Sequence, residues 1–197
     1  MSVEITRAKK EDIPGIMNVF NELSVSNNKS GKDSYKRGFL VYPPDKDDLG
    51  NVVKNNSDVV LVAKDGNKVV GYALAYDMRD WKEKNPNWGS QLNIENEDQS
   101  LYFKHIGRLQ GYKKLGLQME QKAEQIAKEK EYKKIFADIS KENQLSQEVH
   151  EKRGYEKIAE EKKNDGTEWG IYQKNLDALK IGDQYEEKSS SDSYEKE

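Results

Sequence analysis

The chain contains no cysteine and only two histidines, His105 and His150. The absence of cysteine excludes disulfide bonds, thiolate nucleophiles and cysteine-ligated metals together. Two histidines far apart in the sequence also argue against a dedicated zinc or iron site. We therefore predict a protein that holds no metal.

Long apolar runs are missing as well. No stretch approaches the roughly 20 apolar residues that a membrane-spanning helix needs. The first residues, MSVEITRAKKEDI, also lack the apolar core of a secretory signal. The expectation is a cytoplasmic protein that does not bind membranes.

An excess of basic charge is the third absence. Lysine and arginine number 33 against 36 acidic residues, which gives a net charge of −3 and a pI of about 5.7. This balance argues against nucleic acid as the main partner. Only 34% of the residues are hydrophobic, and the mean hydropathy is −1.06, so part of the chain should not pack into a core. We assign that part to residues 178–197, an acidic tail predicted to be disordered, and residues 1–177 to one folded domain.

What is present is a regular alternation of strand and helix patterns. Two apolar runs flank Asp65, Gly66 and Asn67, which is the signature of a β-hairpin turn. Apolar residues at helical spacing predict an amphipathic helix after residue 111 and another helix from Asn143 to Gly154. The predicted order is β-α-α-β-β-β-α-β-α-β-β. Because a strand-helix-strand crossover runs from Phe103 to Ser140, we expect an α/β fold whose sheet is mostly antiparallel but contains one parallel pair.

Three segments carry a resemblance to a known family. They are KVVGYALAYD, FKHIGRLQGYKKLGLQMEQKAEQIAK and ADISKENQLSQEVHEKRGYEKI. With the element order, they resemble the GCN5-related N-acetyltransferases (GNAT) over about residues 3–176. The third segment is the most specific, because Asn143, Ser146, Gly154 and Tyr155 stand at the family's usual spacing. The resemblance implies the GNAT acyl-CoA N-acyltransferase fold, in which helices flank the sheet and the parallel strand pair splays apart.

The resemblance also implies acetyl-CoA as co-substrate, with its pyrophosphate at the start of the helix that follows the fourth strand. A helix N-terminus suits this role, since its free N–H groups and partial positive charge attract phosphate. The residues implied to contact acetyl-CoA are Ile106, Gly107, Leu109, Gly111, Lys113, Lys114, Leu115, Gly116 and Asn143.

The pyrophosphate loop departs from the family pattern Gln/Arg-x-x-Gly-x-Gly/Ala. In one register Gly116 takes the last glycine, Lys114 the first glycine, and Gly111 the Gln/Arg position. In the other register Gly116 is the first glycine, between Lys113 and Gln118. The added lysines could replace backbone contacts with charge, whereas the alternative is that YKKLG is only a solvated helix start.

The chemistry expected of the family needs an oxyanion contact and a proton for the thiolate. The oxyanion contact resembles a backbone N–H at a bulge in the fourth strand, which Gly107 would permit. The usual acid is a tyrosine seven residues after the Asn143 position, where this chain has His150. His150 is either a protonated acid or a packing residue with one hydrogen bond. Tyr155 is expected to close the helix against the sheet.

Candidates for a general base are His105 and three acids, Glu95, Glu97 and Asp98. Strict alternation places His105 on one face with Leu101, Phe103 and Gly107. A histidine on an apolar face is more often a core residue than a base, and the family often lets water carry the amine's proton.

The acceptor is expected to be a primary amine, on a small molecule or on a peptide or protein. Residues 30–44 and 79–89 would line its pocket, or would form a lid over the core. These loops are rich in aromatic residues, namely Tyr35, Phe39, Tyr42, Trp81 and Trp88.

Two alternatives to an N-acetyltransferase remain open. The lost glycines and the missing tyrosine favour a degenerate member that binds CoA weakly and serves as an interaction or regulatory module. The intact element order and Asn143 favour the enzyme, which could also transfer a longer acyl group. Homodimers are common among proteins of this type, so the oligomeric state is left open.

Overall fold

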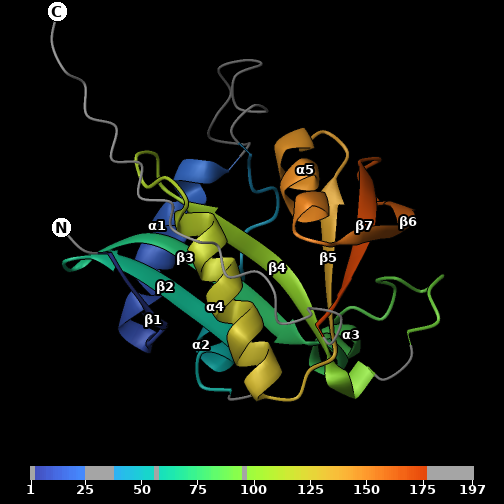
Figure 1. Ribbon diagram of the computed structural model, residues 1–197, viewed down its shortest axis with the longest axis horizontal. Coiled ribbons are helices and arrows are strands. Elements are labelled where there is room, and N and C mark those ends of the chain that lie inside the picture. The colour runs from blue at the N-terminus through green and yellow to red at the C-terminus, as the bar shows by residue number, and fades with distance from the viewer. Residues whose placement is uncertain (1–2, 25–37, 56–57, 95–96, 177–197) are drawn as a thin grey trace, which may run out of the picture.

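The computed structural model describes residues 3–24, 38–55, 58–94 and 97–176, which form a seven-stranded sheet with helices in front of it and behind it (Figure 1). The predicted tail at 178–197, Tyr35 and Glu95 lie outside the described residues. The strands are β1 (Glu4–Arg7), β2 (Val59–Asp65), β3 (Lys68–Asp77), β4 (Ser100–Arg108), β5 (Lys134–Ser140), β6 (Glu156–Lys162) and β7 (Glu168–Asn175).

The strand order is β1-β2-β3-β4-β5-β7-β6. Neighbouring strands run antiparallel except β4 and β5, which are parallel. The β2–β3 hairpin turns at Gly66, whose φ of 59° is the left-handed conformation that such a turn requires. The mixed, mostly antiparallel sheet predicted from the sequence is therefore confirmed.

The helices cover the sheet from both sides. The helices are α1 (Ile13–Leu23), α2 (Lys46–Val52), α3 (Met78–Lys84), α4 (Leu115–Glu129) and α5 (Gln144–Lys152), with short 3-10 turns at Lys10–Asp12 and Glu97–Gln99. In Figure 1, α1 and α2 lie behind the sheet, α4 crosses in front of it, and α5 stands beside the end of β5. No helix in the described part of the chain is long and apolar enough to cross a membrane.

Helix α3 is a difference from the sequence prediction, which has a loop at residues 79–89. The Asp77 side chain accepts a hydrogen bond from the Arg79 N–H at 3.0 Å and begins the helix. Met78 and Trp81 then bury one face of it. Two apolar residues in seven are too few to show a helical period in the sequence.

Strands β4 and β5 pair along only part of their length. Ser100–Phe103 pairs with Lys134–Ala137, but β4 continues to Arg108 and β5 to Ser140. Figure 1 shows the two strands separating toward α5. The expected splayed parallel pair is present, and it leaves one edge of β4 without a strand partner beyond Phe103.

A β-bulge at Lys104 lies where the two strands begin to part. On β3, Leu74 pairs with His105 while the next residue, Ala75, pairs with Phe103, so Lys104 is the extra residue. The sequence predicted the bulge at Gly107. That prediction was wrong, because Gly107 pairs regularly with Tyr72.

The bulge also changes which side chains share a face. Tyr102 and His105 both lie opposite even-numbered residues of β3, so they point to the same side of the sheet. The predicted grouping of His105 with Leu101 and Phe103 is therefore wrong, because one inserted residue reverses the alternation beyond it.

Gly107 has a packing role instead. A Cβ there would lie 2.8 Å from Leu23 Cδ1 at the end of α1. The missing side chain lets α1 approach β4 closely. The next segment is tied to the same place, since the Leu40 N–H donates to the Leu23 carbonyl at 3.1 Å.

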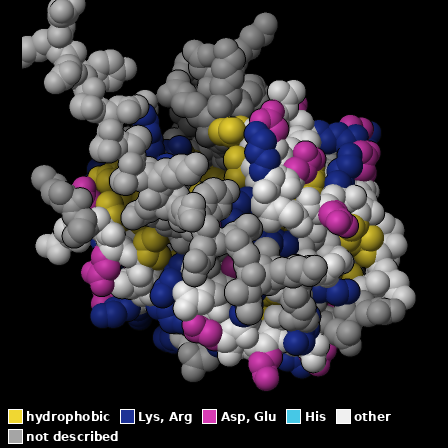
Figure 2. Space-filling model, in the orientation of Figure 1, with side chains coloured by type: hydrophobic (Ala, Val, Ile, Leu, Met, Phe, Trp, Pro, Cys, Tyr) yellow, Lys and Arg dark blue, Asp and Glu magenta, His cyan; other side chains and the backbone are white. Residues whose placement is uncertain are grey.

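The surface shows no large region of one charge on the face drawn in Figure 2, where basic and acidic side chains lie interspersed and hydrophobic ones form small patches. This mixing is consistent with the nearly balanced composition.

Candidate active site

A cleft of about 1200 Å³ opens where β4 and β5 separate. Its lining residues come from the end of β4, the start of α4 and helix α5, and also from the segment 38–42, α3 and the β6–β7 hairpin. The unpaired edge of β4 is therefore part of the cleft wall. Such an edge offers backbone N–H and C=O groups that can pair with an extended ligand.

The predicted acetyl-CoA residues divide into two groups in the structure. Six line the cleft: Ile106, Gly107, Leu109, Lys114, Gly116 and Asn143. Three do not: Gly111 and Lys113 lie in the turn before α4, and Leu115 is buried in the core. The structure therefore brings the strand, the helix start and Asn143 to one cavity.

The start of α4 has the backbone of a glycine-containing loop. Lys114 precedes the helix with a φ of 63°, in the left-handed region that favours glycine. This supports the register that puts Lys114 at the family's first glycine and Gly116 at the last. By helix geometry the N–H groups of Gly116 and Leu117 have no acceptor within α4. A Cβ on Gly116 would have no described atom within 4 Å, so the backbone there is open to a ligand.

Asn143 anchors the start of α5. Its Oδ1 accepts from the Ser146 N–H at 3.3 Å, and its Nδ2 donates to the Phe39 carbonyl at 3.1 Å. The residue is buried and caps the helix. Its side chain therefore ties α5 to the segment 38–42 at the edge of the cleft.

His150 lines the cleft and is largely buried. Its Nδ1 lies 2.7 Å from the Ser146 carbonyl oxygen, so this nitrogen carries a proton and donates it. The ring packs edge-on against Tyr155 with centroids 4.9 Å apart. Burial lowers the pKa of His150, against the smaller opposing effect of the Ser146 backbone. A neutral ring with its proton on Nδ1 has no proton on Nε2 to give to a thiolate, so the geometry favours the packing alternative.

His105 of β4 lines the cleft but is largely buried. Its Nδ1 lies 3.1 Å from the Tyr72 hydroxyl, and the ring stacks on Phe20 at 5.8 Å. Burial and the nearby charge of Lys104 lower the pKa of His105 to about 3. Such a ring takes up protons poorly near neutral pH, so the geometry argues against a general base here.

Two of the acidic base candidates, Glu97 and Asp98, lie within the described residues, and neither lines the cleft. Glu97, in the 3-10 turn before β4, pairs with Lys82 of α3.

A buried polar cluster between α4 and the end of α5 was not predicted from the sequence. Glu120 and Glu124 are both buried, and Arg153 lies 3.4 Å from Glu120 and 3.2 Å from Glu124. Lys174 of β7 bonds Glu124 at 2.5 Å. Glu120 also lines the cleft, and its Oε1 has no hydrogen-bond partner among the described residues.

Burial raises the pKa of Glu120 to about 7, although Arg153 opposes the rise. The sequence does contain a sign that Glu120 is buried. It precedes Ala123 by three residues and Ala127 by seven, so it lies on the same face of the helix as these apolar residues.

Aromatic side chains line one part of the cleft. Trp81 stacks on Tyr102 with centroids 4.3 Å apart, and Trp88 meets the same ring edge-on at 4.9 Å. Phe39 and Tyr42 complete this part. The predicted aromatic loops therefore do line the cavity, and Trp81, Trp88 and Phe39 are buried there.

The comparisons with known proteins agree with this architecture. A model of the acetyltransferase (GNAT) family matches residues 30–155. No curated protein matches the sequence at a significant level.

Three solved structures illustrate the structural similarity. The N-acetyltransferase from Staphylococcus aureus Mu50 is 19% identical, with 89% of this chain and 99% of that chain covered and a TM-score of 0.65. The PaiA N-acetyltransferase from Thermoplasma acidophilum, solved with coenzyme A, is 15% identical, with coverage of 89% and 99% and a TM-score of 0.61. YncA from Salmonella typhimurium, solved with acetyl-CoA, is 16% identical, with coverage of 93% and 99% and a TM-score of 0.64.

Proposed function

Because the chain belongs to the GNAT acetyltransferase family, we propose that it is an N-acetyltransferase that moves the acetyl group of acetyl-CoA to a primary amine. The amine belongs to a small molecule or to a peptide or protein. The observation that carries this proposal is the unpaired edge of β4, which runs from the bulge at Lys104 into a cleft that ends at the start of α4.

The fit to acetyl-CoA follows from the backbone. An extended pantetheine arm can pair with the free N–H and C=O groups of the β4 edge. The start of α4 offers unpaired N–H groups and partial positive charge to the pyrophosphate. Lys114 adds a formal positive charge at the same place.

The reaction balances without a metal. The amine loses a proton, its nitrogen bonds the acetyl carbon, the carbon–sulfur bond breaks, and the sulfur takes up a proton. The bulge in β4 tilts backbone groups toward the point where charge develops on the carbonyl oxygen. We propose that water carries the protons. His105 is a poor base, and the Nδ1 proton of His150 is donated to the Ser146 carbonyl oxygen.

The remaining features of the molecule are also proposals. Residues 1–177 form the acetyltransferase domain and residues 178–197 an appended acidic tail, in a cytoplasmic protein.

Acetyl-CoA binding separates the enzyme from a non-catalytic member of the family. We expect acetyl-CoA to raise the melting temperature, since saturation at 100 times Kd stabilises the folded state by about 2.7 kcal/mol. Gly116→Glu should abolish this rise, because it places a carboxylate at the phosphate position in open space. The control is Gln121→Glu, which adds the same charge at an exposed position of α4 and should keep the rise. No rise in wild type at millimolar acetyl-CoA would refute the proposal.

A further inference from the structure

Lys104 lies in the cleft beside the aromatic side chains of its wall. It is the extra residue of the β4 bulge, and it lines the cleft. Its Nζ lies 5.0 Å from the centre of the Trp81 ring and 5.7 Å from that of Tyr76. The side chain is therefore a cation on the aromatic part of the cleft wall.

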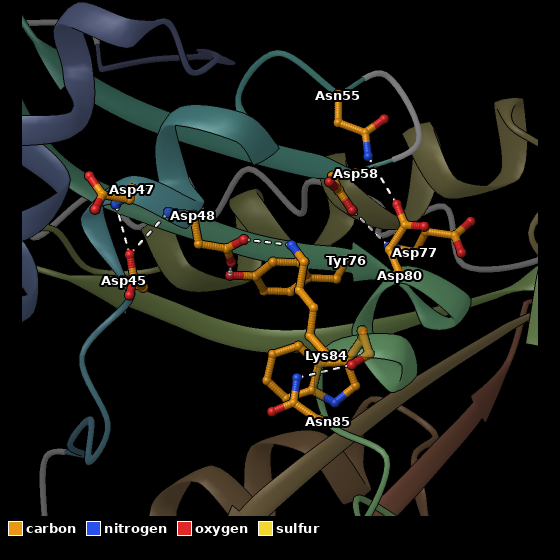
Figure 3. Close-up of polar contacts among 11 residues, drawn as sticks. Asp45, Asp47, Asp48, Asn55, Asp58, Tyr76, Asp77, Asp80, Lys84 and Asn85 are labelled. Carbon is orange, nitrogen blue, oxygen red and sulfur yellow. Dashed lines mark hydrogen bonds and ion pairs between the residues drawn. The ribbon is translucent and has the colours of Figure 1, made fainter.

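This cation has no carboxylate partner within 4.0 Å among the described residues, although carboxylates lie nearby. Asp48 is already used: it accepts from the Tyr76 hydroxyl at 2.9 Å and from Lys84 at 2.6 Å, as Figure 3 shows. Asp45 accepts the N–H groups of residues 47 and 48 at the start of α2 (Figure 3).

Asp138 of β5 is engaged in the same way. It accepts from the Tyr102 hydroxyl and pairs with Lys163 at 3.1 Å. Each of these carboxylates thus accepts hydrogen bonds from other donors. Among the described residues, the Lys104 ammonium group has only cation–π contacts, with the rings of Tyr76 and Trp81.

An unpaired ammonium group in a half-buried cleft is unfavourable, and a bound acceptor would remove more water from it. Burial already lowers the pKa of Lys104, with Asp48, Asp138 and Asp45 opposing the shift. A purely cationic acceptor would add repulsion, whereas an acceptor with its own anionic group would neutralise the lysine. The flat apolar surface of Trp81 and Tyr102 beside it suits the hydrocarbon part of such a molecule.

The aromatic part of the cleft is also narrowed by the segment 38–42, which crosses from α5 to the β6–β7 hairpin. The Phe39 carbonyl accepts a hydrogen bond from the Asn143 side chain. Tyr42 stacks on Trp169 at 5.7 Å, and its hydroxyl donates to Asp165 at 2.7 Å. Both ends of this short crossing are therefore attached, which favours a small ligand over a folded protein chain.

We propose that the acceptor is a small primary amine that also carries a carboxylate, as a free amino acid does, and that the carboxylate pairs with Lys104. The inference rests on the proposed acetyltransferase function and narrows its acceptor class.

The test uses pairs of acceptors that differ only in the carboxylate, such as phenylalanine with phenethylamine and lysine with cadaverine. Release of CoA thiol gives kcat/KM for each acceptor, and calorimetry in the presence of CoA gives binding. We expect wild type to prefer the carboxylate member of a pair at least tenfold. Lys104→Met should remove that preference, and Lys104→Arg should retain most of it. Lys134→Met is the matched control: it removes a half-buried lysine of β5 that does not line the cleft, and the preference should remain.

The outcomes are distinct. Equal use of both members of each pair, or an equal loss on all acceptors in Lys104→Met, would overturn the inference and leave the acetyltransferase proposal standing. An equal loss of this kind would assign Lys104 to the reaction itself rather than to the acceptor.

If no compound releases thiol, calorimetry still decides: carboxylate-dependent binding lost only in Lys104→Met supports the inference. Failure of acetyl-CoA itself to bind would instead count against the proposed function. Acetyl-CoA affinity and circular dichroism of each variant show that it has folded.

Discussion

At the scale of single residues, both histidines are held by hydrogen bonds and ring contacts within the protein. His150 stands at the position where the family's tyrosine acid is expected, yet its Nδ1 proton is bonded to the Ser146 carbonyl and its ring packs on Tyr155. A residue type alone does not reveal which ring nitrogen is occupied. That depends on a carbonyl one helical turn away, which only the folded backbone locates.

His150→Phe tests this assignment. Phenylalanine keeps the ring contact with Tyr155 but loses the hydrogen bond, so we expect a loss of about 1 kcal/mol in the free energy of unfolding and less than a threefold change in kcat. Urea denaturation and thiol release measure the two quantities. The control is Tyr155→Phe, which removes a buried hydroxyl without a partner among the described residues and should cost little. A hundredfold fall in kcat with unchanged acetyl-CoA affinity would instead identify His150 as the acid.

At the scale of elements, close approach of helices to the sheet depends on glycine. A Cβ on Gly15 of α1 would lie 2.6 Å from Val69 Cγ2 on β3, and 2.7 Å from its Cβ. Val69 is part of the sheet and cannot move away as a flexible chain end would. Gly50 of α2 is the contrasting case, because no atom of the described residues lies within 4 Å of a Cβ built there.

These two glycines form a matched pair of substitutions. Gly50→Ala should stabilise the protein by about 0.5–1 kcal/mol, because alanine is the better helix former. Gly15→Ala gains the same propensity but must push α1 away from β3, so we expect a net loss of about 1–3 kcal/mol. Chemical denaturation of both variants measures the contrast. Equal effects would mean that α1 shifts freely on the sheet.

At the scale of the whole molecule, α4 and α5 are joined by a buried charge cluster that links stability to pH. The pKa of Glu120 is raised from 4.5 to about 7, mainly by burial. Between these values the folded protein holds a proton that the unfolded chain has released. The stabilisation from this group is therefore full below pH 4.5 and is lost as the pH rises through 7.

Glu120→Gln should remove this dependence. A shift of this size corresponds to roughly 3 kcal/mol, so we expect the difference in unfolding free energy between pH 5 and pH 8 to change by about 1–3 kcal/mol in the variant. Thermal or urea denaturation at the two pH values measures it. Glu129→Gln, an exposed change at the end of the same helix, is the control and should leave the pH profile as in wild type. An unchanged profile in Glu120→Gln would show that Arg153 keeps Glu120 ionised.

Local signals in the sequence were sufficient for the β2–β3 hairpin, the mixed sheet, the family and the element order apart from α3. Apolar periodicity, turn residues and the spacing from Asn143 to Tyr155 are properties of neighbouring residues, so they can be read without coordinates. What only the tertiary structure decided depends on contacts between distant segments. The bulge at Lys104 depends on the register with β3, and the contact of buried Glu120 depends on Arg153, which follows α5. The hydrogen bond of His105 depends on Tyr72. One inserted residue reverses the faces of a strand, and no local pattern records it.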